Sequence, residues 1–370
     1  MNDIVEAEEN AVVFKNFINN PNDLNNIPYT YKILKYGNKL GSGSDGSIFE
    51  VKCEGTNRLL AAKLICHKND KINDRLKMIK ELKGYNIIRR ENLISKNIEN
   101  KEYTMILMEK AILRDLGKLN NSYFFYNLLK LIYEPFDEHL GDNLLRFYSK
   151  QIVDGLETLN RYNYVHFDLK PENCLITFNL NVKLSDFSLL TKIDNSKEIK
   201  IPGGTPGYLS REYYDRKTRS KSDLQKQDYF ALGSTIFYLK YGEDMLDYEK
   251  FNDPLMNKDR ITDILHNRID YIKSRPFTND DFKKFLLGLI QYNPDERPDF
   301  EYIYRDKWLN KDLENIKSIY KDNEADELKL LLELQKSDFL KMKEVEKNEK
   351  LTTHKKFKFK KKYQGKNKIF

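Results

Sequence analysis

The pattern of hydrophobic and polar residues changes character along the chain. Residues 31–40 (YKILKYGNKL) and 47–53 (SIFEVKC) alternate between apolar and polar side chains, which is the period of a β-strand. Short apolar runs at 59–66 (LLAAKLIC) and 103–108 (YTMILM) predict two more strands. Residues 72–85 instead carry apolar side chains at helical spacing. The first part of the chain is therefore predicted to be a small sheet with one helix.

Helical periodicity dominates the part of the chain that follows. Residues 142–160 place apolar side chains along one face, which predicts a long buried helix. The same period recurs at 223–240, 261–272, 279–292 and 299–305. A strand-rich part followed by a helix-rich part predicts an α+β fold of two lobes, with the chemistry at their junction.

The predicted domain covers residues 31–309, with a first lobe to about residue 110 and a second lobe over 111–309. Residues 1–30 are polar and rich in asparagine, and we expect a largely flexible extension there. Residues 310–350 predict a charged helical extension, and 351–370 form a basic tail. The aromatic segment 118–140 is expected to be a helical insertion near the mouth of the cleft.

The positive charge of the chain is concentrated in its last twenty residues. Residues 351–370 contain eight lysines and no acid, so removing them from the net charge of +7 leaves the other 350 residues at −1. Three interpretations of this tail stay open: a solvated disordered end, a patch for nucleic acid or an import receptor, and a contact with anionic membrane lipids.

Composition adds two further expectations. No run of eighteen apolar residues occurs, so no transmembrane segment is expected. Cys53, Cys66 and Cys174 are scattered without metal-ligand spacing and are expected to be small core residues in a reducing compartment. The expected location is therefore the cytoplasm, or the nucleus if the tail is an import signal.

The stretch from Tyr164 to Asn173 (YVHFDLKPEN) gathers residues that can carry chemistry. Asp168 and Asn173 are five positions apart, so a short loop can direct both side chains into one site, with Lys170 between them. Asp186 follows in VKLSDFS. Carboxylate and amide oxygens suit Mg²⁺. With a phosphate ester present, Asp168 is left to orient and deprotonate an attacking hydroxyl.

Two features of the first lobe suit a phosphate-bearing ligand. Glycines at 41, 43 and 46 (GSGSDG) lie between two predicted strands, which excludes the strand–helix setting of a dinucleotide fold and leaves a glycine lid or a plain hairpin turn. Lys63 is the lone charge in a buried strand and needs an anionic partner. Glu81 on the predicted helix is the best candidate, with Asp74 and Glu91 as alternatives.

Together these motifs resemble, in order over residues 34–309, the protein kinase family of the serine/threonine type. The resemblance implies a two-lobed kinase fold, ATP with Mg²⁺ (or Mn²⁺) as cofactors, and protein substrates. It implies catalytic roles for Asp168, Lys170 and Asn173, with Asn173 and Asp186 as metal ligands. The implied ATP-binding residues are Leu40, Gly41, Gly43, Gly46, Ile48, Ala62, Lys63, Glu81, Met108, Glu109, Ala111 and Leu175.

The resemblance also implies a structural frame on the substrate side. Thr205 (GTPGY) is expected to hydrogen-bond Asp168 and Lys170, and Glu212 is expected to form a buried bidentate ion pair with Arg297. Asp228 is expected to hold the backbone of the catalytic loop, and the tryptophan in DKWL, Trp308, to lie in the core.

Two departures from the family pattern affect the expected activity. Phe167 replaces the arginine that usually precedes the catalytic aspartate and gathers a phosphate. We therefore expect activity that does not require phosphorylation of Thr191, Ser196 or Thr205. Ser188 replaces a glycine after Asp186, which should restrict backbone movement there. The alternative function is a pseudokinase scaffold that binds partners with little or no catalysis.

Overall fold

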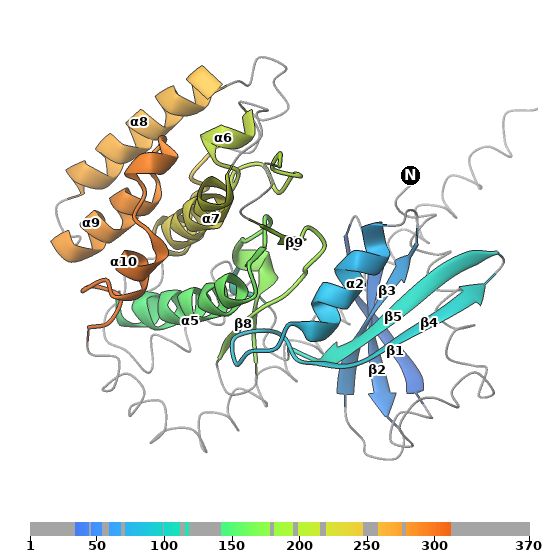
Figure 1. The fold of residues 1–370 in the computed structure, drawn as a ribbon. Helices are drawn as coiled ribbons and strands as arrows, with labels where there is room; N and C mark the ends of the chain where they lie inside the picture. The colour runs from blue at the N-terminus through green and yellow to red at the C-terminus, as the bar shows by residue number, and fades with distance from the viewer. Residues whose placement is uncertain are drawn as a thin grey trace, which may run out of the picture. The chain divides into compact units, whose positions relative to one another are not determined.

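A five-stranded antiparallel sheet forms the N-terminal part of the fold (Figure 1). Its strands are β1 (Leu34–Gly43), β2 (Gly46–Cys53), β3 (Leu59–Cys66), β4 (Arg90–Ile98) and β5 (Lys101–Glu109), arranged in the order β1-β2-β3-β5-β4. The four predicted strands are thus confirmed. The sequence pattern missed β4, because this edge strand pairs only with β5 and its residues are mostly polar or half-buried.

The structure is a computed structural model that describes residues 34–43, 46–53, 59–67, 71–98, 100–111, 115–117, 142–177, 181–194, 199–214, 220–246, 258–275 and 279–311. The predicted N-terminal extension, the 118–140 insertion, the segment after residue 311 and Ser196 lie outside the described residues.

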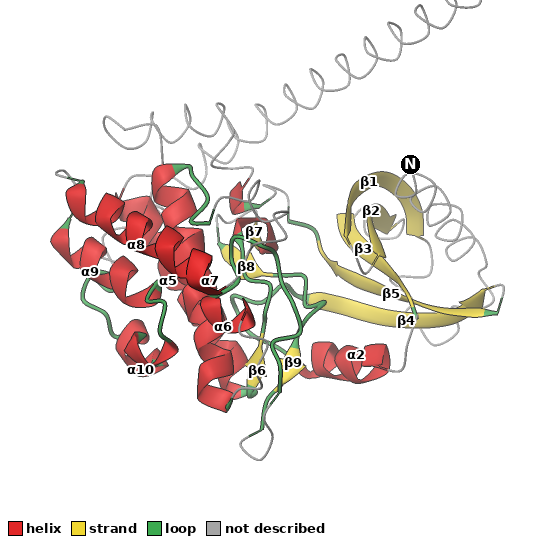
Figure 2. Cartoon of the chain, turned by 90° about the horizontal axis from the view of Figure 1, so that it is seen from above, coloured by secondary structure: helices red, strands yellow, loops and turns green. Residues whose placement is uncertain are grey.

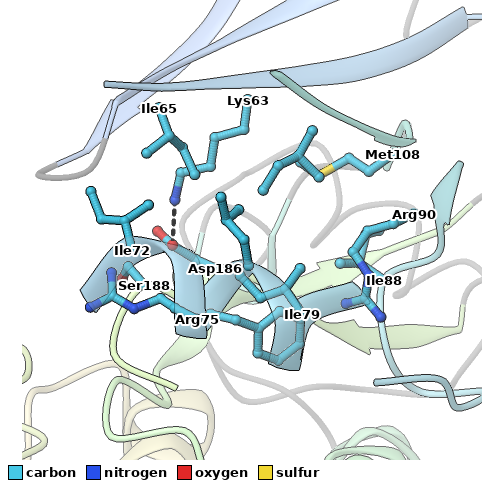
Figure 3. A pocket seen from close by; sticks show the side chains of 13 residues that line it. Lys63, Ile65, Ile72, Arg75, Ile79, Ile88, Arg90, Met108, Asp186 and Ser188 are labelled. Atoms are coloured by element: carbon cyan, nitrogen blue, oxygen red, sulfur yellow. Dashed lines mark hydrogen bonds and ion pairs between the residues drawn. The ribbon is translucent and has the colours of Figure 1, made fainter. Parts of the chain in front are cut away.

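Helix α2 (Lys71–Glu81) packs against the sheet and is the helix predicted at 72–85. Its residues Ile72, Leu76 and Ile79 lie on one face, as the three- and four-residue spacing requires. Ile79 is buried, and Leu82 is buried just after the helix ends. Packing of this apolar face places α2 beside the strand that carries Lys63 (Figure 3).

Helices form most of the C-terminal part (Figure 2). They are α5 (Asp142–Arg161), α6 (Arg211–Tyr214), α7 (Lys221–Tyr241), α8 (Lys258–Ser274), α9 (Asp280–Leu289) and α10 (Phe300–Tyr304). All five helices predicted in this part are confirmed to within a few residues. Trp308 is fully buried, and its ring lies 5.0 Å from the Phe282 ring and 5.2 Å from the Phe285 ring, so its predicted place in the core is confirmed.

Two small antiparallel pairs of strands carry the loops of chemical interest. One pairs β6 (Tyr164–Val165) with β9 (Thr191–Lys192), and the other pairs β7 (Cys174–Ile176) with β8 (Val182–Leu184). Such short pairs fix the ends of each loop, and the helices behind them supply the buried surface that isolated hairpins lack.

The strand β8 also connects the helical part to the sheet. The backbone N–H of Ile88 donates to the Leu184 carbonyl at 2.9 Å, and the Leu184 N–H donates to the Asn86 carbonyl at 2.8 Å. The Lys183 ammonium lies 2.8 Å from the Glu109 carboxylate at the end of β5. These contacts fix the approach of Lys63 to Asp186. No helix among the described residues is long and apolar enough to cross a membrane.

Candidate active site

Asp228 of α7 holds the loop between β6 and β7 through two hydrogen bonds to its backbone. One oxygen of this carboxylate accepts the His166 N–H at 2.7 Å, and the other accepts the Phe167 N–H at 2.9 Å. Burial raises the pKa of Asp228 to about 6, against the opposing effects of His166 and the two backbone hydrogen bonds. The expected contact of Asp228 with the backbone of this loop is confirmed.

Two residues of the site have left-handed backbones. Phe167 has φ of 63° and Asp186 has φ of 52°, a region that residues other than glycine rarely adopt. Two buried N–H bonds to Asp228 secure the first of these conformations. Backbone strain of this kind persists only where surrounding contacts enforce it, and it aims the side chain of the next residue, Asp168, at the site.

The Asp168 carboxylate is surrounded by donors. Its Oδ1 accepts hydrogen bonds from the Thr205 backbone N–H at 2.8 Å and from the Thr205 hydroxyl at 2.7 Å. Its Oδ2 accepts the Asn173 amide at 3.1 Å and lies 3.4 Å from the Lys170 ammonium. Lys170 also donates to the Thr205 hydroxyl at 2.5 Å. The predicted contacts of Thr205 with Asp168 and Lys170 are therefore confirmed.

Asn173 and Asp186 are brought together by Ser185. The Ser185 N–H and hydroxyl both donate to the Asn173 carbonyl, at 2.9 and 3.0 Å. The Asn173 amide nitrogen donates to the backbone carbonyl of Asp168 at 2.7 Å as well as to its carboxylate. Sequence reasoning did not single out Ser185, whose only signal is its position directly before Asp186.

Lys63 pairs with Asp186, and the predicted pair with Glu81 is wrong. The Lys63 ammonium lies 2.6 Å from Asp186 Oδ1, and the lysine side chain is 9% exposed and the aspartate side chain 29% exposed. Burial would raise the pKa of Asp186, but the charge and hydrogen bond of Lys63, with His166 and Ser188, hold it below its usual value. The alternatives fail too, because Asp74 lies 3.8 Å from Lys77 and Glu91 lies 2.7 Å from Arg89.

The helical period explains why Glu81 is absent from the site. Glu81 is two residues beyond the inward-facing Ile79, a rotation of about 200° around the helix. It is exposed at the end of α2 and hydrogen-bonds the Tyr164 hydroxyl. Burial, followed by the charge of Glu81 and this hydrogen bond, raises the pKa of Tyr164. The apolar stripe of the sequence already placed position 81 off the buried face.

The glycine turn joins β1 to β2 beside β3. Gly43 pairs with Gly46, and Gly41 pairs with Ile48, which in turn pairs with Lys63 of β3. Gly46 has φ of 147°, and a Cβ there would lie 1.9 Å from the Leu64 carbonyl oxygen. Position 46 therefore requires glycine for both its backbone and its close approach to β3.

The residues expected around adenine lie on three different segments. Ala62 is fully buried in β3, Met108 and Glu109 end β5, and Leu175 is half-buried in β7. Leu40 in β1 is 42% exposed. The half-buried Ala111 follows β5 by two positions. The expected contact of these residues with adenine stays a prediction.

Glu109, at the end of β5, makes contacts with both lobes. The backbone N–H of Glu109 donates to the Arg89 carbonyl at 2.9 Å, and its carboxylate accepts from the Arg89 N–H at 2.6 Å. The same carboxylate contacts Lys183. The side chain and N–H of Glu109 therefore hold the connection between lobes.

The predicted ion pair between Glu212 and Arg297 is confirmed. The two terminal guanidinium nitrogens donate to the two carboxylate oxygens at 2.6 and 2.8 Å, and both side chains are almost completely buried. Arg297 also donates to the carbonyls of Gln291 and Lys226. This bidentate pair fixes the end of the segment that begins at Asp186.

The sheet, the helical part and this set of converging polar side chains define a protein kinase domain. Residues 34–309 match the protein kinase domain family, and the chain belongs to that family, with relatives of the serine/threonine type. The chain is 26% identical over 256 residues to serine/threonine-protein kinase MRCK alpha of Homo sapiens, covering 66% of this chain and 14% of that protein.

Two other relatives cover more of the domain. NUAK family SNF1-like kinase 1 of Mus musculus is 26% identical over 290 residues, which is 77% of this chain and 39% of that protein. Serine/threonine-protein kinase plk-1 of Caenorhabditis elegans is 24% identical over 279 residues, covering 73% and 38%. The chain thus spans well under half the length of these relatives.

Proposed function

We propose that this chain transfers the γ-phosphoryl group of ATP to serine or threonine hydroxyls of proteins. The observation that carries this proposal is the arrangement around Asp168. Thr205 and Asn173 orient its carboxylate, while Lys170 stands beside it. One carboxylate with fixed orientation and one adjacent cation are the groups that phosphoryl transfer needs beside the attacking hydroxyl.

The residues present fit ATP with a divalent metal. Two residues offer oxygen ligands for the metal. One is the Asp186 carboxylate, and the other is the Asn173 amide, whose oxygen accepts no hydrogen bond from any residue that the structure describes. Hard cations such as Mg²⁺ prefer such oxygens. When bound, ATP with its metal supplies the phosphoryl group and offsets its developing charge. Lys63 is the cation that would hold the inner phosphates.

Each side chain then has one task. Asp168 Oδ2 accepts the proton of the attacking hydroxyl, since Oδ1 already accepts two hydrogen bonds from Thr205, whereas Oδ2 accepts one, from the Asn173 amide. Lys170 places positive charge beside the transferred group. Asn173 holds the Asp168 backbone and carboxylate, so the base and the metal ligands move as one unit.

We also propose that activity does not depend on phosphorylation of the activation segment. Phe167 is buried in an apolar cluster with Val165, Ile193, Ile201, Leu209 and Leu224. Leu189 and Ile199 pack against the same cluster. Residues before and after the middle of the segment thus belong to one apolar cluster with Phe167, which stands at the position where the family carries arginine. Burial of apolar surface replaces a phosphate–arginine contact in this arrangement.

One observation favours the alternative of a pseudokinase scaffold. The residues that α2 presents to Lys63 are Ile72, Arg75, Leu76 and Ile79, and none is an acid. The lysine is held by Asp186 instead, which is itself a proposed metal ligand. Binding of ATP and metal must therefore separate this ion pair, and a chain unable to do so would not turn over.

The experiment that separates the two functions compares the unphosphorylated wild-type protein with Asp168→Asn. Phosphate transfer from labelled ATP to a general protein substrate should be present in the wild type and lower by at least about a hundredfold in the variant. Adding Mg-ATP should raise the denaturation temperature of both proteins. Equal transfer by both proteins, or none by either, overturns catalysis. Transfer that appears only after treatment with an activating kinase overturns phosphorylation independence alone.

A further inference from the structure

A row of polar side chains crosses β4, β5 and the end of β3. Ser95 of β4 pairs with Thr104 of β5, and their hydroxyl oxygens lie 2.6 Å apart. The Thr104 hydroxyl also lies 2.7 Å from Nε2 of His67, which directly follows β3. Nδ1 of the same ring lies 3.2 Å from Glu102 Oε2. These four side chains, the polar row, include no residue of the candidate active site.

The two ends of the polar row differ in their access to water. Thr104 is buried, and the His67 side chain is only 7% exposed. The backbone N–H of His67 donates to the Glu102 carbonyl at 2.8 Å, which fixes the start of this side chain. Ser95 is exposed, because β4 is an edge strand that pairs only with β5 among the described strands. The row therefore joins a hydroxyl in water to an imidazole kept from water.

The partners determine the direction of each hydrogen bond in the polar row. Nδ1 of His67 faces the Glu102 carboxylate, which has no hydrogen to give, so Nδ1 carries the hydrogen of the neutral ring. This contact is not aligned as a hydrogen bond and acts through charge. Nε2 is then an acceptor, and the Thr104 hydroxyl donates to it. Having given its one hydrogen, the Thr104 oxygen accepts that of Ser95.

This order of donors is that of an activated nucleophile, in which a base can remove the proton of an attacking hydroxyl and a carboxylate stands beside the base. A pair of hydroxyls across two strands stabilises a sheet without any base. His67 and Glu102 add a group that can hold the proton of Ser95. Asn97 follows Ser95 by two positions and lies on the same face of β4, so its amide can donate to an oxygen on which negative charge develops.

We propose that Ser95 is a nucleophile that accepts acyl groups from activated esters and thioesters, with His67 as a base that acts through Thr104. The Ser95 oxygen attacks the carbonyl carbon, and the bond from this carbon to the ester oxygen or thioester sulfur breaks. The Ser95 proton passes to Thr104 while the Thr104 proton passes to His67 Nε2. The imidazolium then releases a proton that neutralises the leaving alkoxide or thiolate. The product is an O-acyl serine on the sheet edge, and this reaction does not rest on the proposed kinase function.

The test treats the full chain with p-nitrophenyl acetate and measures acetylation of individual serines by peptide mass spectrometry at early times. Ser274 is the internal control, because it is exposed as well, but its hydroxyl donates to the Tyr271 carbonyl at 2.8 Å and contacts no histidine or carboxylate among the described residues. Ser95 should be acetylated at least about tenfold faster than Ser274, since a positioned base contributes roughly a hundredfold or more. Equal rates at the two serines overturn the proposal.

Substitutions within the polar row separate a proton relay from simple exposure of Ser95. Thr104→Val keeps the shape of the side chain without its hydroxyl, and His67→Gln removes the base. Each should slow acetylation of Ser95 at least about tenfold. Thr104→Ser keeps the hydroxyl and should retain a rate close to that of the wild type. A wild-type rate in folded Thr104→Val or His67→Gln overturns the proposal. Should both variants fail to fold, the comparison of Ser95 with Ser274 in the wild type decides it.

Discussion

The substitution Phe167→Arg tests whether an apolar cluster holds the activation segment. It restores the residue type that the family carries before the catalytic aspartate. In this chain, however, the side chain at position 167 is 1% exposed and is enclosed by Val165, Ile193, Ile201 and Leu209. A guanidinium there would meet aliphatic carbon on most sides, so the substitution should destabilise the domain even though it makes the sequence more typical.

The magnitude follows from the buried surface. A buried phenylalanine removes roughly 150–250 Å² from water, worth about 4–6 kcal/mol at about 25 cal/mol per Å², which is an upper bound. Removal of such side chains costs about 3–5 kcal/mol in practice. We expect Phe167→Arg to lower the free energy of unfolding by about 3–5 kcal/mol, which corresponds to a fall in denaturation temperature of roughly 10 °C. Phe167→Leu keeps an apolar side chain and should cost less than about 1.5 kcal/mol.

Urea unfolding of the three proteins measures these differences directly, and phosphate transfer should be compared at a temperature where all three are folded. We expect the arginine variant to lose transfer activity in step with its loss of the cluster. A midpoint for Phe167→Arg equal to that of the wild type would refute the reasoning, because the ring would then contribute nothing by its burial. So would equal losses in the leucine and arginine variants.

Two further predictions address charged residues in and near the site. Glu81→Gln should leave the Kd for Mg-ATP within about twofold of the wild type, whereas Lys63→Met should raise this Kd by about tenfold or more, because Lys63 contacts Asp186 and Glu81 contacts Tyr164. Calorimetric titrations measure both values, and equal weakening by the two substitutions would contradict this assignment. Asp228 has a pKa of about 6 when folded and an ordinary value of 3.8, so between pH 4.5 and 7 the unfolded chain binds fewer protons at this group and its contribution to stability falls as pH rises. The stability advantage of wild type over Asp228→Asn should therefore shrink by about 2 kcal/mol across that range, measured by urea unfolding, and a constant or growing advantage would show that the carboxylate is not buried as described.

Much of the site could be predicted from the sequence because its members are close together in the chain or occur in a fixed order. Asp168, Lys170 and Asn173 belong to one short loop, so their convergence needs only that loop to fold. The contacts of Thr205, Asp228 and Arg297 join distant segments, and they could be predicted because the motifs that carry them recur in family order.

Other features depended on details that motifs do not contain. The eighteen-residue spacing between Lys63 and Glu81 fits an ion pair, but the rotation of α2 turns position 81 away, and Lys63 pairs with Asp186 instead. The strand β4 was missed because an edge strand with polar residues has no clear period. The buried Nη1 of Arg90, which has no hydrogen-bond partner, had no signal in the sequence, because an exposed arginine and a buried one look the same there.

The sequence by itself determined the family, the order of the lobes and the residues that can bind metal, phosphate and hydroxyl. The reason is that periodicity and local spacing fix helices, strands and short loops. Only the tertiary structure decided which polar groups meet: Lys63 meets Asp186, Glu81 meets the neutral hydroxyl of Tyr164, and the buried Nη1 of Arg90 has no hydrogen-bond partner among the described residues. Charge pairing depends on which faces of packed elements oppose each other at a few ångströms, and no pattern within a single segment encodes that distance.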